Sequence, residues 1–161
     1  MANAVTNLGA WHREQNEEAA AEVLYRRALS IREKAFGPEH PNVATAINNV
    51  ANLLRARRDY AEAKTLYLRL LSILEKAVGP DHPDVAAALN GLALLNRQQD
   101  HNAIAEPLYR RSLAITEKAM GPEHPDVAGV LENYAVLLRQ AGRDTEAERL
   151  QARALIIRAM Q

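Results

Sequence analysis

An all-α solenoid of four helix-turn-helix repeats is the fold class that this sequence of 161 residues predicts. The first observation is a phrase that returns every 42 residues, as GPEHPNVA from Gly37, GPDHPDVA from Gly79 and GPEHPDVA from Gly121. The second is a pair of apolar stripes with helical spacing between successive phrases. The third is a composition dominated by alanine, leucine, glutamate and arginine, which favour helices.

The recurring phrase divides the chain into four similar copies, which we expect to pack as one domain. Their boundaries fall near residues 1–36, 37–78, 79–120 and 121–161, and the first copy starts without a phrase of its own. Because such a unit contacts mainly its neighbours, we expect the core to continue from copy to copy.

Each copy contains two predicted helices separated by a short polar break. In the second copy, the i, i+3, i+4, i+7 spacing of one helix face is followed by Ile47, Val50, Ala51 and Leu54. After the break at 57–59, a second apolar stripe runs through Tyr60, Ala63, Tyr67, Leu70, Leu71 and Leu74. The counterparts of the break in the other copies are 15–17, 99–101 and 142–144.

The recurring phrase has the residues needed to end one helix and begin the next. Its glycine follows the last apolar turn, where a left-handed residue is favoured, and the adjacent proline prevents the helix from continuing. The second proline suits the first turn of the next helix, because the N–H that it lacks would have no partner there. The residue after it, which is Asn42, Asp84 or Asp126, lies at the positive end of the helix dipole. The phrase is therefore predicted to be a structural joint.

The histidines of the phrase, His40, His82 and His124, could also be interpreted as metal ligands. They would lie on successive units about 10 Å apart if the helices pack at their usual spacing. Zinc ligands must all approach one ion to about 2 Å, and the chain has no cysteine to complete such a site. We therefore expect no metal and no cofactor.

Composition and motifs argue against several classes of function. Lysine plus arginine and aspartate plus glutamate both number 20, so the chain lacks the basic excess of a general nucleic-acid binder. No apolar run reaches the roughly 18 residues needed to span a bilayer, and we expect a cytoplasmic location. No phosphate-binding glycine motif occurs, and Ser30 and Ser72 share one position inside a predicted helix. We expect no catalytic activity.

Small and aromatic residues recur at fixed places in the copies. The first helix carries a small residue at Gly9, Ala51, Ala93 and Ala135, and the second carries one at Ala21, Ala63, Ala105 and Ala147. An aromatic follows four residues later at Tyr25, Tyr67 and Tyr109, and Gln151 replaces it in the last copy. This arrangement resembles the tetratricopeptide repeat. The 42-residue period and stretches such as HPDVA at 82–86 are similar to the kinesin light chain subclass.

The resemblance implies a right-handed superhelix whose first helices line a concave groove that binds a protein or a peptide. The residues expected in that groove are Asn7, Asn48, Asn49, Asn52, Asn90, Asn133, Arg13, Arg55, Arg97, Arg139, Leu94 and Val136. Asparagine amides can both donate to and accept from an extended peptide backbone, and the row of arginines can bind carboxylates. We therefore expect an extended, acidic segment as the ligand.

Two other interpretations remain open at this stage. The polar stripe could be an ordinary solvated helix face whose arginines pair with neighbouring acids. Alternatively, the repeats could serve stacking or self-association, or sensing, within a larger regulatory protein such as a signalling ATPase. Apolar residues of the last helix, including Leu155, Ile156 and Met160, predict self-association through the terminal repeats. Trp11 shares a row with Leu53, Leu95 and Leu137, and we expect it to pack rather than to bind a ligand.

Overall fold

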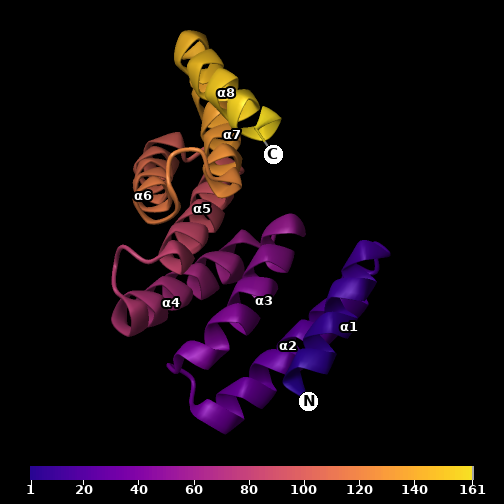
Figure 1. Ribbon diagram of the computed structural model, residues 1–161. Coiled ribbons are helices and arrows are strands. Elements are labelled where there is room, and N and C mark those ends of the chain that lie inside the picture. The colour runs from indigo at the N-terminus through magenta and orange to yellow at the C-terminus, as the bar shows by residue number, and fades with distance from the viewer. Residues whose placement is uncertain (161) are drawn as a thin grey trace. The chain divides into compact units, whose positions relative to one another are not determined.

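The computed structural model describes residues 1–160, which form eight α-helices and one short 3-10 helix (Figure 1). In chain order these are α1 (Ala2–Glu14), α2 (Glu18–Phe36), η1 (Pro41–Val43), α3 (Ala44–Ala56), α4 (Tyr60–Val78), α5 (Pro83–Arg97), α6 (Asn102–Met120), α7 (Pro125–Gln140) and α8 (Asp144–Ala159). The predicted all-α architecture of four helix-turn-helix repeats is confirmed. The chain divides into two compact units, unit 1 (Met1–Ala77) and unit 2, which begins at Val78.

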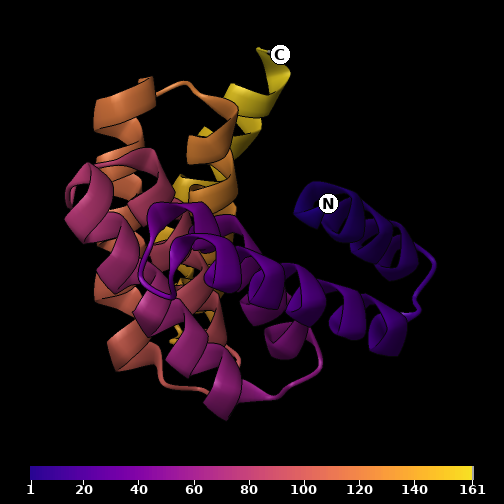
Figure 2. The ribbon, with the colours of Figure 1, turned by 90° about the horizontal axis from the view of Figure 1, so that it is seen from below.

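Unit 1 is built from paired helices, and α1 and α2 lie side by side as a hairpin in both ribbon views (Figures 1 and 2). Gly9 explains how closely these two helices approach. A Cβ atom at Gly9 would lie 2.8 Å from ring carbons of Tyr25, which is buried. In the next pair, the Tyr67 hydroxyl on α4 donates a hydrogen bond of 2.7 Å to Oδ1 of Asn52 on α3. In the first pair the small residue and the tyrosine therefore pack together, as the periodicity indicated.

Buried side chains of unit 2 pack in clusters. One cluster surrounds Tyr109 and Tyr134, whose rings stack with their centroids 5.8 Å apart. Another joins α7 to α8 through Val127, Ala128, Leu131, Ala154 and Ile157. Burial of this apolar surface is the main source of stability for such helix pairs.

The four polar breaks share one backbone feature. Asn16, Arg58, Asp100 and Gly142 have φ angles of 61°, 65°, 59° and 72°, and they occupy the same position in successive copies. A left-handed residue here ends the first helix and lets the second helix turn back along it. Three of the four are not glycine, so the fold tolerates some backbone strain at this point.

The glycine of the recurring phrase has positive φ, as predicted, but its conformation is not the left-handed helical one. Gly37 has φ 92° and ψ 155°, and Gly121 has φ 93° and ψ 154°. Gly79, with φ 89°, has a similar φ angle. This extended region of positive φ is open essentially to glycine alone, which explains the residue better than the predicted helical cap does.

The histidines of the phrase are N-caps, a role that was not predicted from the sequence. Nδ1 of His40, His82 and His124 accepts a hydrogen bond from the backbone N–H two residues later, at 3.1, 3.2 and 3.2 Å. The ring thereby satisfies one of the N–H groups left without a partner at a helix start. The acceptor role places the ring proton on Nε2.

Trp11 departs from the sequence prediction. Its side chain is 52% exposed and contacts His12 edge-to-face. The expectation that it packs like the leucines at the equivalent positions was therefore wrong. Leu53, Leu95 and Leu137 at the equivalent positions are all buried.

Candidate functional site

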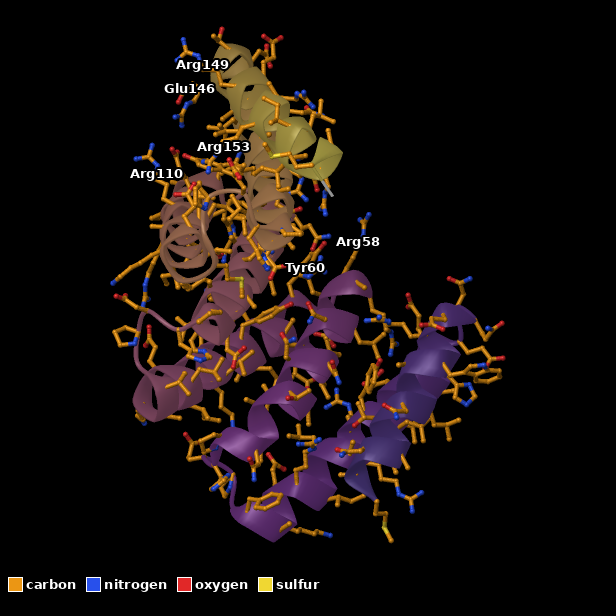
Figure 3. The ribbon with its side chains drawn as sticks, viewed as in Figure 1. Arg58, Tyr60, Arg110, Glu146, Arg149 and Arg153 are labelled. Atoms are coloured by element: carbon orange, nitrogen blue, oxygen red, sulfur yellow. The ribbon has the colours of Figure 1, made fainter. Side chains whose placement is uncertain are left out.

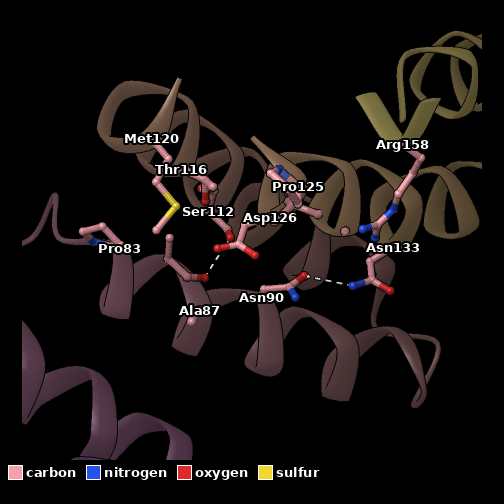
Figure 4. Close-up of a pocket in the computed structure, with 13 residues that line it drawn as sticks. Pro83, Ala87, Asn90, Ser112, Thr116, Met120, Pro125, Asp126, Asn133 and Arg158 are labelled. Carbon is pink, nitrogen blue, oxygen red and sulfur yellow. Dashed lines mark hydrogen bonds between the residues drawn. The ribbon is translucent and has the colours of Figure 1, made fainter. Parts of the chain in front are cut away.

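A groove of about 320 Å³ opens between α5 and α7 in unit 2 (Figure 4). Asn90 on α5 and Asn133 on α7 both line it, and Asn133 Nδ2 lies 3.3 Å from Asn90 Oδ1. This hydrogen bond links two of the asparagines that the sequence pattern singled out. It leaves Nδ2 of Asn90 and Oδ1 of Asn133 for other partners.

The floor of the groove is made by the C-terminal half of α6, through Ser112 and Thr116. Ser112 Oγ donates to the Ala86 carbonyl at 2.8 Å, and Thr116 Oγ1 donates to the Ser112 carbonyl at 2.8 Å. One repeat earlier these positions hold Leu70 and Leu74, which are 2% and 6% exposed. The groove therefore lies where two leucines of the preceding repeat are replaced by the smaller Ser112 and Thr116. This replacement is visible in the sequence, but it was not used to predict a groove.

Charged residues lie at the rim of the groove. Asp126, in the first turn of α7, has a side chain that is 63% exposed. Arg158 of α8 holds Glu132 through two hydrogen bonds of 3.2 and 3.3 Å. These bonds to Glu132 raise the pKa of the Arg158 guanidinium, and the charge of Asp126 adds to the effect. Neither Arg158 nor Asp126 was predicted from the sequence as a groove residue.

The remaining predicted asparagines lie in unit 1. Asn48 and Asn49 are half-buried on α3, and Asn7 is exposed on α1. Asn52 is also half-buried, and its amide oxygen already accepts from the Tyr67 hydroxyl. Its Nδ2 keeps two donors, so Asn52 retains part of the hydrogen-bonding capacity that the prediction assumed.

The four predicted arginines, Arg13, Arg55, Arg97 and Arg139, all lie in the last turn of a first helix. A positive charge there interacts favourably with the helix dipole. Arg139 donates to Oε1 of Gln151, and Arg55 hydrogen-bonds the Tyr67 hydroxyl. Burial raises the pKa of Tyr67, and the charge of Arg55 opposes that shift.

Arg13 and Arg97 form no hydrogen bond or ion pair through their side chains with any of residues 1–160. Nε of Arg97 is moreover buried without an acceptor in this part of the chain. The arginines of the second helices behave differently, since most of them bind a carboxylate. The pairs are Arg26–Glu62, Arg69–Glu33, Arg110–Glu106, Arg153–Glu117 and Arg158–Glu132.

The two predicted apolar positions differ in their availability. Leu94 is half-buried and packs against the cluster around Tyr109 and Tyr134. Val136 is 39% exposed on α7. Val136 is therefore more accessible than Leu94 to a ligand on this face.

Neither a metal-ligand cluster nor a membrane-spanning helix is found within residues 1–160. No three histidine, aspartate or glutamate side chains gather there as metal ligands would. Among the helices in that range, none has both the length and the apolar character required to cross a bilayer.

Comparison with known proteins identifies relatives by sequence profile and by fold. The tetratricopeptide repeat profile matches residues 1–76, 43–118 and 102–159. No curated protein sequence gives a significant match. The crystal structure of BtubC (BKLC) from P. vanneervenii is similar over 99% of this chain, with a TM-score of 0.85 and 26% identity. The match covers 63% of the BtubC chain, so the present chain spans less than two thirds of that protein.

A kinesin light chain-like protein from Podosopora anserina with nearly identical TPR-like repeats is also similar. Its TM-score is 0.83 at 22% identity, over 99% of this chain and 75% of that one. A variant of the same protein with a glutamine replaced by methionine gives the same values. These structures support the fold that the repeat pattern predicted, and the profile matches extend over nearly the whole chain. The chain belongs to the tetratricopeptide repeat family.

Proposed function

We propose that the polar face of the first helices binds an extended, acidic segment of a partner protein and performs no catalysis. Tetratricopeptide repeat domains generally act as protein-binding scaffolds and are typically not catalytic. What the proposal adds is the surface and the chemistry of the ligand.

The observation that carries the proposal is the contrast between the two sets of arginines. Arginines of the second helices are largely neutralised by glutamates, whereas Arg13 and Arg97 on first helices have no carboxylate partner within residues 1–160. Arg139 binds only a neutral amide. A guanidinium group that has no carboxylate partner can donate hydrogen bonds to a ligand carboxylate without first breaking an ion pair.

The asparagines provide contacts of a different kind. Asn48 and Asn49 on α3, and Asn90 with Asn133 in unit 2, are half-buried and carry amide groups able to bind a peptide backbone. Each such hydrogen bond contributes about 1 kcal/mol, and each arginine–carboxylate contact at an exposed rim about 0.2–1 kcal/mol. We therefore expect micromolar affinity that weakens as salt is added.

Titration of acidic and neutral peptides against matched variants tests the proposal. Arg97→Ala should weaken acidic peptides most and flatten the salt dependence, whereas Asn49→Ala should weaken all ligands alike. Arg149→Ala is the control, because Arg149 is an exposed arginine on α8, outside the first helices (Figure 3). Equal binding of acidic peptides to the parent and to the triple variant of Arg55, Arg97 and Arg139 would show that this face is only solvated.

A second candidate function is self-association within a larger regulatory protein. Leu155 and Ile156 on α8 and Met160 directly after it are 62%, 60% and 58% exposed, which is unusual for three neighbouring apolar side chains. Sedimentation at rising concentration should reveal association, and Leu155→Glu should reduce it. A chain that stays monomeric at millimolar concentration would exclude this function for the isolated domain.

A further inference from the structure

Unit 1 contains an arginine at the position where unit 2 has its groove. Arg32 of α2 and Thr116 of α6 occupy the same repeat position, two periods apart. The Arg32 side chain is half-buried, and it donates 2.7 Å hydrogen bonds to the backbone carbonyl of Asn42 and to Oδ1 of Asn3. One guanidinium group thus joins α2 to α1 and to η1.

In unit 2 the third copy has no such side chain at this position, and the fourth copy has Arg158, whose guanidinium binds Glu132. Thr116 is shorter, and its hydroxyl bonds to the carbonyl of Ser112 in its own helix. The counterparts of Asn42 and Asn3 are Asp126 and Ala87, and both of these line the groove. The position that a guanidinium fills in unit 1 is therefore part of an open groove in unit 2, and a carboxylate has replaced a neutral amide at its rim.

We propose that the groove between α5 and α7 receives an arginine side chain from the bound segment. This inference rests on the proposed function and specifies one residue of the ligand. The guanidinium donates to the carboxylate of Asp126, and its aliphatic stem lies along Met120 and Val130. The built-in arginine of unit 1 shows that a side chain of this size and chemistry suits the repeat geometry.

The charges around the groove are compatible with a cation. Arg158 is the one positive residue in the lining, and its charge is balanced by two hydrogen bonds to Glu132. Asp126 has no cationic side chain within ion-pair distance, among residues 1–160, other than the ring of His124 at 3.6 Å, and this ring is charged only when protonated. An arginine ligand would therefore meet a net negative rim.

The groove and the arginine row occupy different levels of the same helices. Asn90 in the groove and Arg97 in the row are seven residues apart on α5, which corresponds to about 10 Å along the helix axis. Roughly three residues of extended peptide span that distance. A ligand with an arginine and, about three residues away, an acidic residue would satisfy both sites.

The first experiment needs no acidic peptide. N-acetyl-argininamide and its neutral isostere N-acetyl-citrullinamide are titrated separately while the side-chain amide NMR signals of Asn90 and Asn133 are followed. Argininamide should shift these signals in the parent, and citrullinamide should shift them at least threefold less at the same concentration. Equal shifts from the two compounds, or none from either, would overturn the proposal.

The second experiment uses an acidic peptide with one arginine and the same peptide with citrulline. The parent should bind the arginine peptide about three- to fivefold more tightly, as expected for one ion pair at an exposed rim. Asp126→Asn copies Asn42 of unit 1 and should abolish this preference. Thr116→Arg copies Arg32 and should abolish it too, while the salt-sensitive contribution of Arg97 persists.

The two readouts separate failure of this inference from failure of the proposed function. Loss of the Arg97 dependence with a retained argininamide effect would contradict only the acidic-segment proposal. An unchanged arginine preference in Asp126→Asn would overturn the groove assignment. Arg158→Gln leaves Glu132 without its partner and should increase the arginine preference, and a decrease would likewise count against the assignment. Circular dichroism of each variant checks that it is folded.

Discussion

In unit 1 the guanidinium of Arg32 reaches out of α2 to bind Asn42 and Asn3, whereas in unit 2 the hydroxyl of Thr116 turns back to its own helix beside a groove. The helix pairs around these two residues are otherwise built alike. The backbone of the repeat therefore determines where a side chain of a second helix enters the space between two first helices. The size and polarity of that side chain then decide whether the space is filled or open.

Other positions have the same structural role in both units. His40 and His124 cap a helix through Nδ1, and Asn16 and Gly142 have the same left-handed conformation. An ion pair also recurs, since Arg26–Glu22 in unit 1 matches Arg110–Glu106 in unit 2. These positions define the backbone frame, and substitutions there should act on stability in both units.

The largest expected effect is the loss of a buried tyrosine. Tyr109→Ala removes a fully buried ring that stacks on Tyr134, and should lower the free energy of unfolding by about 3–5 kcal/mol. Because repeats contact mainly their neighbours, faster amide hydrogen exchange should appear first in α5–α8. Tyr25→Ala is the matched variant and should affect α1–α3 first. Equal loss of protection along the chain in both variants would show that the units do not differ in local stability.

Removal of a histidine cap should have a smaller effect that is similar in the two units. His40→Ala and His124→Ala each leave a backbone N–H without its acceptor, and should lower the free energy of unfolding by about 0.5–2 kcal/mol. Asparagine at the same positions can accept this hydrogen bond, so His40→Asn and His124→Asn should recover most of the loss. Chemical denaturation measures all four variants. If the asparagine variants are as unstable as the alanine variants, the ring acts by another contact.

Much of this frame could be predicted from the sequence, because it depends on residue types with strong local preferences. The glycine and prolines of the phrase marked the joints, and the spacing of residues such as Ile47 and Leu54 gave the helix faces. The caps were missed because histidine is an uncommon cap and its acceptor role depends on ring orientation. The groove was missed because it forms where Ser112 and Thr116 are smaller than the leucines at the equivalent positions. This difference in side-chain volume is seen only when the repeats are compared position by position.

Glu106 should make stability depend on pH in unit 2. Burial alone would raise the pKa of Glu106, but hydrogen bonds from Arg143, Tyr134 and Arg110 together hold it below its ordinary value. A lowered pKa in the folded state means that the contribution is complete above the unfolded pKa and is lost as the pH falls through the folded value. Glu106→Gln should therefore cost about 0.5–1 kcal/mol at neutral pH, and this cost should shrink as the pH falls below the ordinary range of a glutamate pKa.

The counterpart of this carboxylate in unit 1 provides the control. Glu22 accepts hydrogen bonds from Arg26 and Arg57 but, among residues 1–160, from no tyrosine hydroxyl. Glu22→Gln should consequently cost less than Glu106→Gln in denaturation experiments at neutral pH. A cost for Glu106→Gln that is the same at neutral and at acidic pH would mean that its charge is not what stabilises the network.

The smallest expected effect concerns the left-handed residue of the breaks, where the copies differ in how well the residue fits. Arg58 in unit 1 has φ 65°, and Gly142 at the same position in unit 2 has φ 72°. A residue with a Cβ is strained in this conformation, so Arg58→Gly should raise the free energy of unfolding by up to about 1 kcal/mol. The gain is limited because glycine also has more conformational freedom to lose when the chain folds. Ala56→Gly, two residues earlier at the last residue of α3, is the control and should be destabilising by up to about 1 kcal/mol. If thermal or chemical denaturation shows both substitutions to be destabilising, the left-handed residue of the break is not a source of strain, and the two units are equally well adapted there.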